Sequence, residues 1–341
     1  MTTKDGGGGF RERYAVHRLR DGGLIVDLVT GTYSRLNASA AEICAVLLEA
    51  PDAAASVLRV AQLFACSDDV ARSAIADVLA GLARRGPRRE PLGSYRYLRD
   101  PTGGYLLTSS GRPRIAIDAD GAHVRLAAPD DDSTSLEQIF AYLRAVAPKA
   151  LFLQSTLVMH GAANRTRQGV RVISGVSGAG KTTTARAFAA SGAELFAEDM
   201  LVVASLSPAS IFSTGEKTID DWAEQSAATL IRDRRRQIAT SMLGPTNRGA
   251  PTPIEEIWFI DGGRRLREAP VLSPRKLGET DGALAIMTSL FLGGASNDAW
   301  REFLTIAGAL ASSVPVFETL MPDGIDRLEA AARRYTESSA S

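Results

Sequence analysis

The pattern of apolar and polar positions near the start of the chain predicts a small sheet followed by helices. Three strands are predicted over residues 15–19, 23–29 and 31–36, and three helices over 40–49, 56–64 and 71–84. The turn at Asp21-Gly22-Gly23 joins the first two strands, and Asn37 has the side chain of a helix N-cap. A small β-meander with three helices is the layout of a winged helix-turn-helix.

The pattern changes after Gly86-Pro87, where residues 87–91 have the composition of a linker. Further strands are predicted over residues 114–118, 123–126 and 169–174, and further helices over 135–147 and 183–191. The first of these helices is expected to close at Pro148, because proline lacks the amide that continues a helix. The strand over 169–174 and the helix after it enclose a glycine-rich segment.

That segment matches the phosphate-binding pattern G-x-x-x-x-G-K-[ST] between Gly175 and Thr182. Its glycines let successive amides point at an anion, and the helix that begins near Lys181 adds its positive end. Lys181 is expected to reach the β- and γ-phosphates of ATP, and the Thr182 hydroxyl to hold Mg²⁺. The predicted nucleotide-binding residues are Gly175, Ser177, Gly178, Ala179, Gly180, Lys181, Thr182 and Thr183.

Composition narrows the class of protein. The 341 residues suggest two or three domains, and 39 basic residues balance 39 acidic ones, which gives no support for a nucleic-acid or membrane-surface role. Cys44 and Cys66 lie in apolar settings and are interpreted as small buried side chains rather than a disulfide or a metal pair. No apolar run is long enough for a transmembrane helix and the first nine residues do not form a signal peptide, so we expect a cytoplasmic protein.

The first predicted unit resembles the PqqD-like domains of ribosomal peptide pathways. The residues that carry the resemblance are Gly23 to Asp27, Gly31 to Tyr33, Leu36, Asn37, Ala40, and Val78, Leu79 and Leu82 before Gly86. The resemblance implies that the leader segment of a precursor peptide adds a strand to the sheet edge, where unpaired backbone groups can accept it. A winged-helix packing module without a partner is the alternative. DNA binding is disfavoured because the third helix is basic only at Arg72, Arg84 and Arg85.

The region from about 151 to 203 resembles the HPr kinase/phosphorylase superfamily. The matching residues are His160-Gly161, the loop from Gly175 to Thr182, Gly192, Leu195 to Ala197, and the acidic pair Glu198-Asp199. The resemblance implies a P-loop on a mostly antiparallel central sheet, related to phosphoenolpyruvate carboxykinase. With the winged helix-turn-helix before it, the expected fold class is α+β.

The same resemblance implies roles for five residues. Lys181 contacts the phosphates, Thr182 holds Mg²⁺ where the family usually has Ser, and Asp199 acts as base toward an acceptor hydroxyl. Glu198 replaces the usual Asp and is expected in the metal shell, and His160 lies near the transferring phosphate, with titration expected near neutral pH. Two alternatives stay open: Asp199 as a metal carboxylate only, and His160 as a core histidine.

Three features depart from the family pattern or compete with it. The family's further metal-binding Glu has no recognisable copy here, since neither Glu216 nor Glu224 lies in its motif. The basic run Arg232 to Arg236 is interpreted as a solvated helix face, with a clamp for an acidic peptide or a phosphate as the sharper hypothesis. Asp261 is a rival metal carboxylate and ranks below Asp199 because the following glycines indicate a turn.

Together the two resemblances imply an ATP-dependent kinase that phosphorylates a Ser or Thr hydroxyl of a captured precursor peptide, as in lasso-peptide biosynthesis. The predicted layout is a disordered tail over 1–12, a recognition domain over 13–90, a catalytic domain over 91–335 and a flexible C-terminus over 336–341. The alternatives are an ATP-binding peptide chaperone, a kinase of free serine or another small hydroxyl compound, and an ATP-dependent transcription regulator. Because members of the catalytic family often form oligomers, a homo-oligomer stays open.

Overall fold

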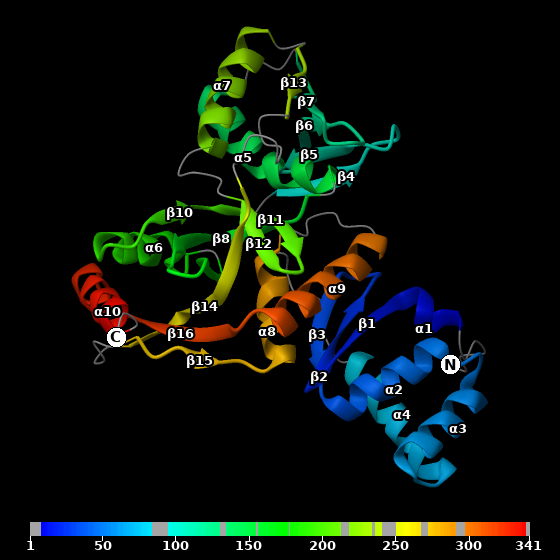
Figure 1. Ribbon diagram of the computed structural model, residues 1–341. Coiled ribbons are helices and arrows are strands. Elements are labelled where there is room, and N and C mark those ends of the chain that lie inside the picture. The colour runs from blue at the N-terminus through cyan, green and yellow to red at the C-terminus, as the bar shows by residue number, and fades with distance from the viewer. Residues whose placement is uncertain are drawn as a thin grey trace. The chain divides into compact units, whose positions relative to one another are not determined.

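Two units make up the chain, which is described here by a computed structural model (Figure 1). The described residues are 8–83, 95–129, 134–154, 156–176, 178–212, 218–233, 236–240, 250–266, 272–290 and 297–338. Unit 1 comprises Met1–Arg89, Leu277–Met287 and Ala295–Ser312, and unit 2 comprises Glu90–Lys276, Thr288–Gly294 and Ser313–Ser341. The segment predicted as the recognition domain therefore shares its unit with two segments from far along the chain. The predicted linker at 87–91 lies outside the described residues.

Unit 1 is built around an antiparallel sheet in the order β1-β2-β3. Its elements are α1 (Gly8–Arg13), β1 (Tyr14–Leu19), β2 (Gly22–Asp27), β3 (Thr32–Leu36), α2 (Ala38–Glu49), α3 (Ala53–Phe64), α4 (Asp68–Ala83), most of α8 (Glu279–Ser289) and most of α9 (Asn297–Ser313). The three predicted strands and three predicted helices are present. Asn37 caps α2 as expected, since its side chain accepts the Ala40 amide at 2.8 Å.

One face of this sheet packs on the helices that follow it in sequence. Ile25 and Leu36 bury against Cys44 of α2 and Leu82 of α4. Phe10 of α1 packs on the same core, and its ring lies 4.8 Å from that of Tyr14. The expected disordered tail over 1–12 is therefore wrong for residues 8–12, because burial of Phe10 gives the short helix an apolar anchor. Residues 1–7 lie outside the described residues.

The opposite face of the sheet is covered by α8 and α9. Leu24 stands directly opposite His17 and shares its face, and a methyl group added at Gly308 of α9 would collide with the His17 imidazole. The Trp300 ring of α9 lies 6.2 Å from the ring of Tyr33. Because both faces are covered, Leu24 is fully buried and the sheet is the middle layer of three.

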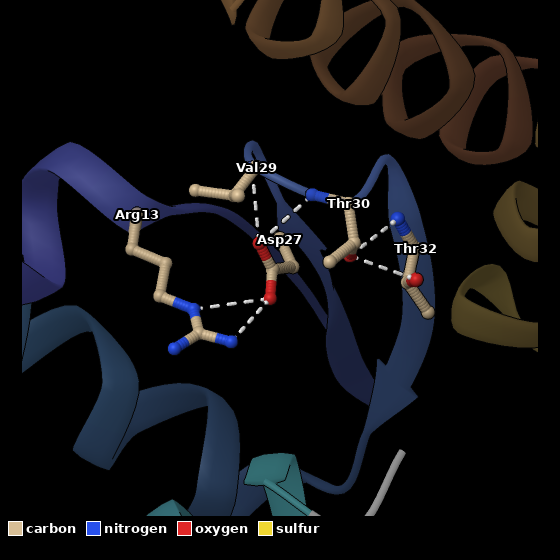
Figure 2. A network of polar contacts seen from close by, with 5 residues as sticks. All are labelled: Arg13, Asp27, Val29, Thr30 and Thr32. Atoms are coloured by element: carbon tan, nitrogen blue, oxygen red, sulfur yellow. Dashed lines mark hydrogen bonds and ion pairs between the residues drawn. The ribbon is translucent and has the colours of Figure 1, made fainter. Parts of the chain in front are cut away.

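The β2–β3 hairpin is ordered by a carboxylate at the end of β2 (Figure 2). One oxygen of Asp27 accepts the amides of Val29 and Thr30 at 3.0 and 3.3 Å, and the other accepts the Arg13 guanidinium at 2.9 Å. The Thr30 hydroxyl then donates to that of Thr32 at 2.9 Å. An Asp at this position mimics a backbone turn, which explains why the loop closes after so few residues.

The first sheet of unit 2 is antiparallel, in the order β13-β7-β6-β5-β4. Its elements are β4 (Tyr95–Arg99), β5 (Tyr105–Ser109), β6 (Arg112–Ile117), β7 (His123–Leu126), β13 (Ile238–Ala239), and the covering helices α5 (Leu136–Leu153) and α7 (Thr218–Arg232). The predicted end of α5 at Pro148 is wrong, because the helix continues to Leu153. Residues just after Pro148, such as Leu151, are buried in the shared core, and this packing outweighs the lost helical hydrogen bond.

The second sheet of unit 2 is mixed and partly closed into a barrel. Its strands are β8 (Val158–Arg165), β9 (Val170–Gly175), β10 (Leu195–Ala197), β11 (Met200–Leu206), β12 (Ala209–Phe212), β14 (Thr252–Leu266), β15 (Arg275–Lys276) and β16 (Val316–Pro322). Pairings β8-β11-β12-β14-β9-β8 close a ring, in which only the β9–β14 pairing of the described residues is parallel. β16 also runs parallel to β14, and β10 and β15 add antiparallel edges.

Helices α6 (Lys181–Ala190) and α10 (Ile325–Ser338) pack on this sheet around a buried cation. The Arg171 guanidinium lies 4.5 to 4.9 Å from the ring centroids of Phe188, Trp258 and Tyr335, and pairs with Glu256 at 2.5 Å. This packing carries α10 to Ser338, into the stretch that was expected to be flexible. Residues 339–341 lie outside the described residues.

Two expectations from composition can be checked against the fold. Cys44 and Cys66 are both free thiols; Cys44 is buried as expected, whereas Cys66 is only half-buried. Among the helices of the described residues, none combines the length and the apolar character that crossing a membrane requires.

Candidate functional site

The glycine-rich segment joins a strand to a helix, as its sequence predicts. Strand β9 ends at Gly175 and α6 begins at Lys181. A methyl group at Gly175 would lie 2.5 Å from the Ile260 carbonyl oxygen of β14, so only glycine fits this close approach. Gly178 and Gly180 have φ of 78° and 96°, in the left-handed region that favours glycine. Ser177 lies outside the described residues.

The first turn of α6 has the properties of an anion site. Its N-cap, Gly180, has no side chain with which to bond the first amides of the helix. The Thr184 amide and hydroxyl both donate to the Gly180 carbonyl oxygen, at 2.8 and 2.9 Å, which fixes the turn. Helix N-termini carry unpaired amides and a partial positive charge, so this end suits a phosphate. Ala179 is buried beneath the loop, while Thr183 is exposed.

Lys181 is held inside the loop. Its side chain is buried, with 7% of the residue exposed, and its Nζ donates to the carbonyl oxygens of Gly175 and Val176, each at 3.1 Å. Burial lowers the pKa of Lys181, and the nearby Asp199 carboxylate raises it in part. The ammonium group therefore lies among the backbone groups that the pattern assigns to phosphate.

Asp199 occupies a strained turn between β10 and β11. Its φ is 61°, and the Met200 amide donates to the Glu198 carbonyl oxygen at 2.7 Å, which closes a three-residue γ-turn around it. The Gly161 amide of β8 donates to the Asp199 carbonyl oxygen at 3.3 Å. Asp tolerates positive φ better than most residues, and such strain is typical of functional positions.

His160 lies on β8 directly opposite Met200, next to that turn. Burial, with a smaller contribution from the Lys181 charge, lowers its pKa to about 4, and the Asp199 charge partly opposes the change. The expected titration near neutral pH is therefore wrong, because a half-buried imidazole beside a lysine resists a second positive charge. His160 is neutral at pH 7. The three predicted catalytic residues, His160, Lys181 and Asp199, form one electrostatically coupled group.

Glu198 is engaged in a contact that the sequence did not indicate. Both of its carboxylate oxygens accept from the Arg186 guanidinium of α6, at 2.8 and 3.0 Å. The Glu198 side chain is 8% exposed, and that of Arg186 is 67% exposed. The carboxylate predicted for the metal shell thus already has a cationic partner, and we expect it to support the acidic turn instead.

The remaining donor set fits a magnesium ion carried by a nucleotide. Thr182 supplies a hydroxyl at the start of α6, and Asp199 supplies a carboxylate. Within the described residues, no group of three or more His, Cys, Asp and Glu side chains could hold a metal ion. Mg²⁺ in nucleotide sites needs only one or two protein ligands, since phosphates and water complete its shell.

Arg144 is the site residue that sequence reasoning missed. It lies on α5, and its Nη2 donates to Asp199 Oδ2 at 2.8 Å. The two residues are 55 positions apart in the sequence, and no motif or periodicity links them. Only the packing of α5 beside the barrel brings this guanidinium to the acidic turn.

Some of the other sequence candidates lie on α7, and some lie outside the described residues. Glu224 is exposed on α7, and Arg232 ends that helix in an exposed position. Glu216, Arg234 and Arg235 lie outside the described residues, and the Asp261 side chain is not described either, although its backbone belongs to β14.

Comparison of the chain with models of known protein families finds no match, and comparison with curated proteins finds none either. The function of the chain is therefore inferred from the residues of the site.

Proposed function

We propose that this chain is an ATP-dependent kinase that transfers the γ-phosphate to a Ser or Thr hydroxyl of a ribosomally synthesised precursor peptide. The observation that carries the proposal is the juxtaposition of a glycine-rich strand–loop–helix, a buried lysine in that loop and a carboxylate coupled to it. The first two elements suit a triphosphate, and the third suits a hydroxyl proton.

The transfer of the phosphoryl group can be written with the loop, the lysine and the carboxylate alone. The acceptor oxygen attacks the γ-phosphorus, the bond to the bridging oxygen of ADP breaks, and the hydroxyl proton passes to Asp199. Lys181 and the α6 amides offset the negative charge on the phosphate oxygens. Mg²⁺, held through Thr182 and Asp199, would supply further charge compensation. The neutral His160 can orient a phosphate oxygen by a hydrogen bond without competing for the proton.

Two features of the fold support the HPr kinase type of fold and the capture of a peptide by unit 1. The barrel of unit 2 carries its P-loop strand antiparallel to β8 and parallel to β14, which departs from an all-parallel nucleotide-binding core and favours the HPr kinase type. In unit 1, β1 and β3 pair only with β2 among the described strands, so each has an outer edge that an extended peptide can extend. A leader bound there would raise the local concentration of its acceptor segment.

A second candidate is an ATP-binding protein that delivers the peptide without phosphorylating it. One observation favours it: Asp199, the proposed base, is ion-paired with Arg144 at 2.8 Å. A delivery protein needs the phosphate loop but no base, so the two candidates differ in what Asp199 does.

The deciding experiment incubates the full chain with ATP, Mg²⁺ and a candidate precursor peptide, followed by mass spectrometry. A kinase adds one phosphoryl group, and fragmentation locates it on a Ser or Thr. The control is Asp199→Asn, because Asn also tolerates a positive φ and preserves the turn. We expect this variant to bind ATP and to lose transfer.

Free serine in a parallel reaction tests the small-molecule alternative, and unchanged peptide with bound ATP supports the delivery protein.

A further inference from the structure

The ion pair at the acidic turn is open to solvent. The side chains of Arg144 and Asp199 are 42% and 51% exposed, and they meet at 2.8 Å. Exposed pairs contribute at most about 1 kcal/mol, because water screens both charges and each side chain loses freedom. Either partner can therefore exchange the other for a more highly charged ligand at little cost.

The two arginines beside the acidic pair differ in how firmly they are held. Arg186 makes two hydrogen bonds to Glu198, which is buried, so its release would leave a buried carboxylate without its partner. Release of Arg144 would leave Asp199, whose side chain is half exposed and can be solvated by water. Arg144 is thus the arginine whose contact can be given up on ligand binding.

Arg144 is linked to the glycine-rich loop through its partner Asp199. Its partner Asp199 acts electrostatically on Lys181, and both strands that flank Asp199 pair with β8, the neighbour of the loop strand β9. A guanidinium offers a planar set of donors that matches phosphate oxygens, and a terminal phosphate carries more negative charge than a single carboxylate. The site therefore contains a second cation suited to the outer end of a triphosphate.

We propose that Arg144 is a phosphate-binding residue that exchanges Asp199 for the terminal phosphate of ATP, which frees the carboxylate to accept the hydroxyl proton. The exchange rests on the proposed function in that it takes ATP as the ligand. It resolves the conflict between an ion-paired Asp199 and a base, because the pair exists only before the γ-phosphate arrives.

The test is the affinity of the full chain for two nucleotides with Mg²⁺, ADP and a non-hydrolysable ATP analogue, measured by titration calorimetry. Arg144→Gln should weaken binding of the analogue about ten-fold or more, since a hydrogen bond to a charged group is lost. Its ADP affinity should change less than about two-fold, which also shows that the variant is folded. Arg125→Gln, which removes an exposed arginine from β7 of the same unit, is the matched control and should change neither.

The two nucleotide affinities are then measured with and without Arg144→Gln in an Asp199→Asn background. This separates a direct contact of Arg144 with the phosphate from an indirect effect of Arg144 through Asp199. If Arg144 contacts the phosphate, Arg144→Gln still weakens binding of the analogue in that background. If Arg144 acts only through Asp199, Arg144→Gln does not change the affinity for the analogue in the Asp199→Asn background, and the proposal is overturned. Equal losses for ADP and the analogue would overturn it as well.

These measurements use no acceptor peptide, so they are independent of whether transfer occurs. If Arg144→Gln weakens only the ATP analogue but the wild-type chain does not phosphorylate the peptide, the Arg144 contact is retained and the kinase is rejected. Phosphorylation without discrimination would retain the kinase and reject the contact. Failure of the wild-type chain to bind either nucleotide would reject both.

Discussion

At the scale of single residues, the site combines groups whose charges are set by burial. Lys181 is buried with its ammonium against two carbonyl oxygens, and His160 is half-buried and neutral. Asp199 is the exposed member of the group and carries the backbone strain. A buried cation, a neutral imidazole and an exposed carboxylate have different tasks, because only the exposed group can exchange protons freely with an incoming hydroxyl.

The pKa of His160 predicts a pH dependence of stability. Its folded value of about 4 lies below the unfolded value near 6.5, so the unfolded chain binds the proton more tightly. The associated stability is complete above about pH 6.5 and is lost as the pH falls toward 4. Between pH 7.5 and 4.5 we expect the wild type to lose roughly 2 kcal/mol more of its unfolding free energy than His160→Asn. Urea unfolding across this range measures it, and parallel profiles would contradict it.

The Arg186–Glu198 pair predicts an asymmetry between two substitutions. Arg186→Gln leaves a buried carboxylate without its cation, whereas Glu198→Gln leaves an arginine that is mostly in water. We expect Arg186→Gln to lower the unfolding free energy by about 1–3 kcal/mol and Glu198→Gln by less. Thermal melts of the two variants make the comparison. If Glu198→Gln also raised the Mg²⁺ concentration required for ATP binding, the metal-shell role expected from the sequence would be restored.

At the scale of elements, glycine decides how closely helices approach their neighbours. Gly308 lets α9 lie against His17 of β1, and Gly175 lets the loop strand end against β14. Gly81 in α4 has open space where its side chain would be. Packing therefore requires glycine at position 308 in α9, whereas it does not require glycine at position 81 in α4.

This contrast gives a matched pair of variants. Gly308→Ala should destabilise the protein because the new methyl group meets the His17 ring, whereas Gly81→Ala should stabilise it by about 0.5–1 kcal/mol through helix propensity. Chemical denaturation of both variants is the measurement. A gain in stability from Gly308→Ala would show that α9 does not depend on this close approach.

At the scale of the whole molecule, unit 1 is assembled from segments far apart in the sequence. Leu24 and Val26 are fully buried although their face of the sheet has no cover within residues 8–83, because α8 and α9 supply it. The Asp21 carboxylate fastens the sheet to α8 by accepting the Thr280 amide at 2.8 Å and its hydroxyl at 2.6 Å. The recognition segment therefore depends on the later part of the chain.

A fragment of residues 10–90 should consequently not behave as an independent domain. We expect it to bind a hydrophobic dye and to unfold without a cooperative transition, because a sheet face that contains Leu24 and Val26 would be in water. Dye fluorescence and circular dichroism melts of the fragment and the full chain make the test. A sharp melt without dye binding would refute the dependence, and peptide-binding measurements should use the full chain.

The sequence allowed local features to be predicted and left long-range ones open. The strand–loop–helix around residues 175–181, the strands and helices of residues 14–83, and the Asn37 cap follow from neighbouring residues. The Arg144–Asp199 contact and the cover of Leu24 join positions that no short pattern relates. Pro148 shows the same limit, since a local helix-ending signal gives way to burial in a core that forms only in the folded chain.

The layered sheet also has a consequence for synthesis on the ribosome. Strand β3 is complete more than two hundred residues before α8 and α9 emerge, which at about 5–20 residues per second corresponds to roughly 10–50 seconds. During this interval the nascent chain presents an uncovered apolar sheet to the cell. Translation pauses after β3 should therefore increase capture by chaperones, whereas pauses after α9 should not.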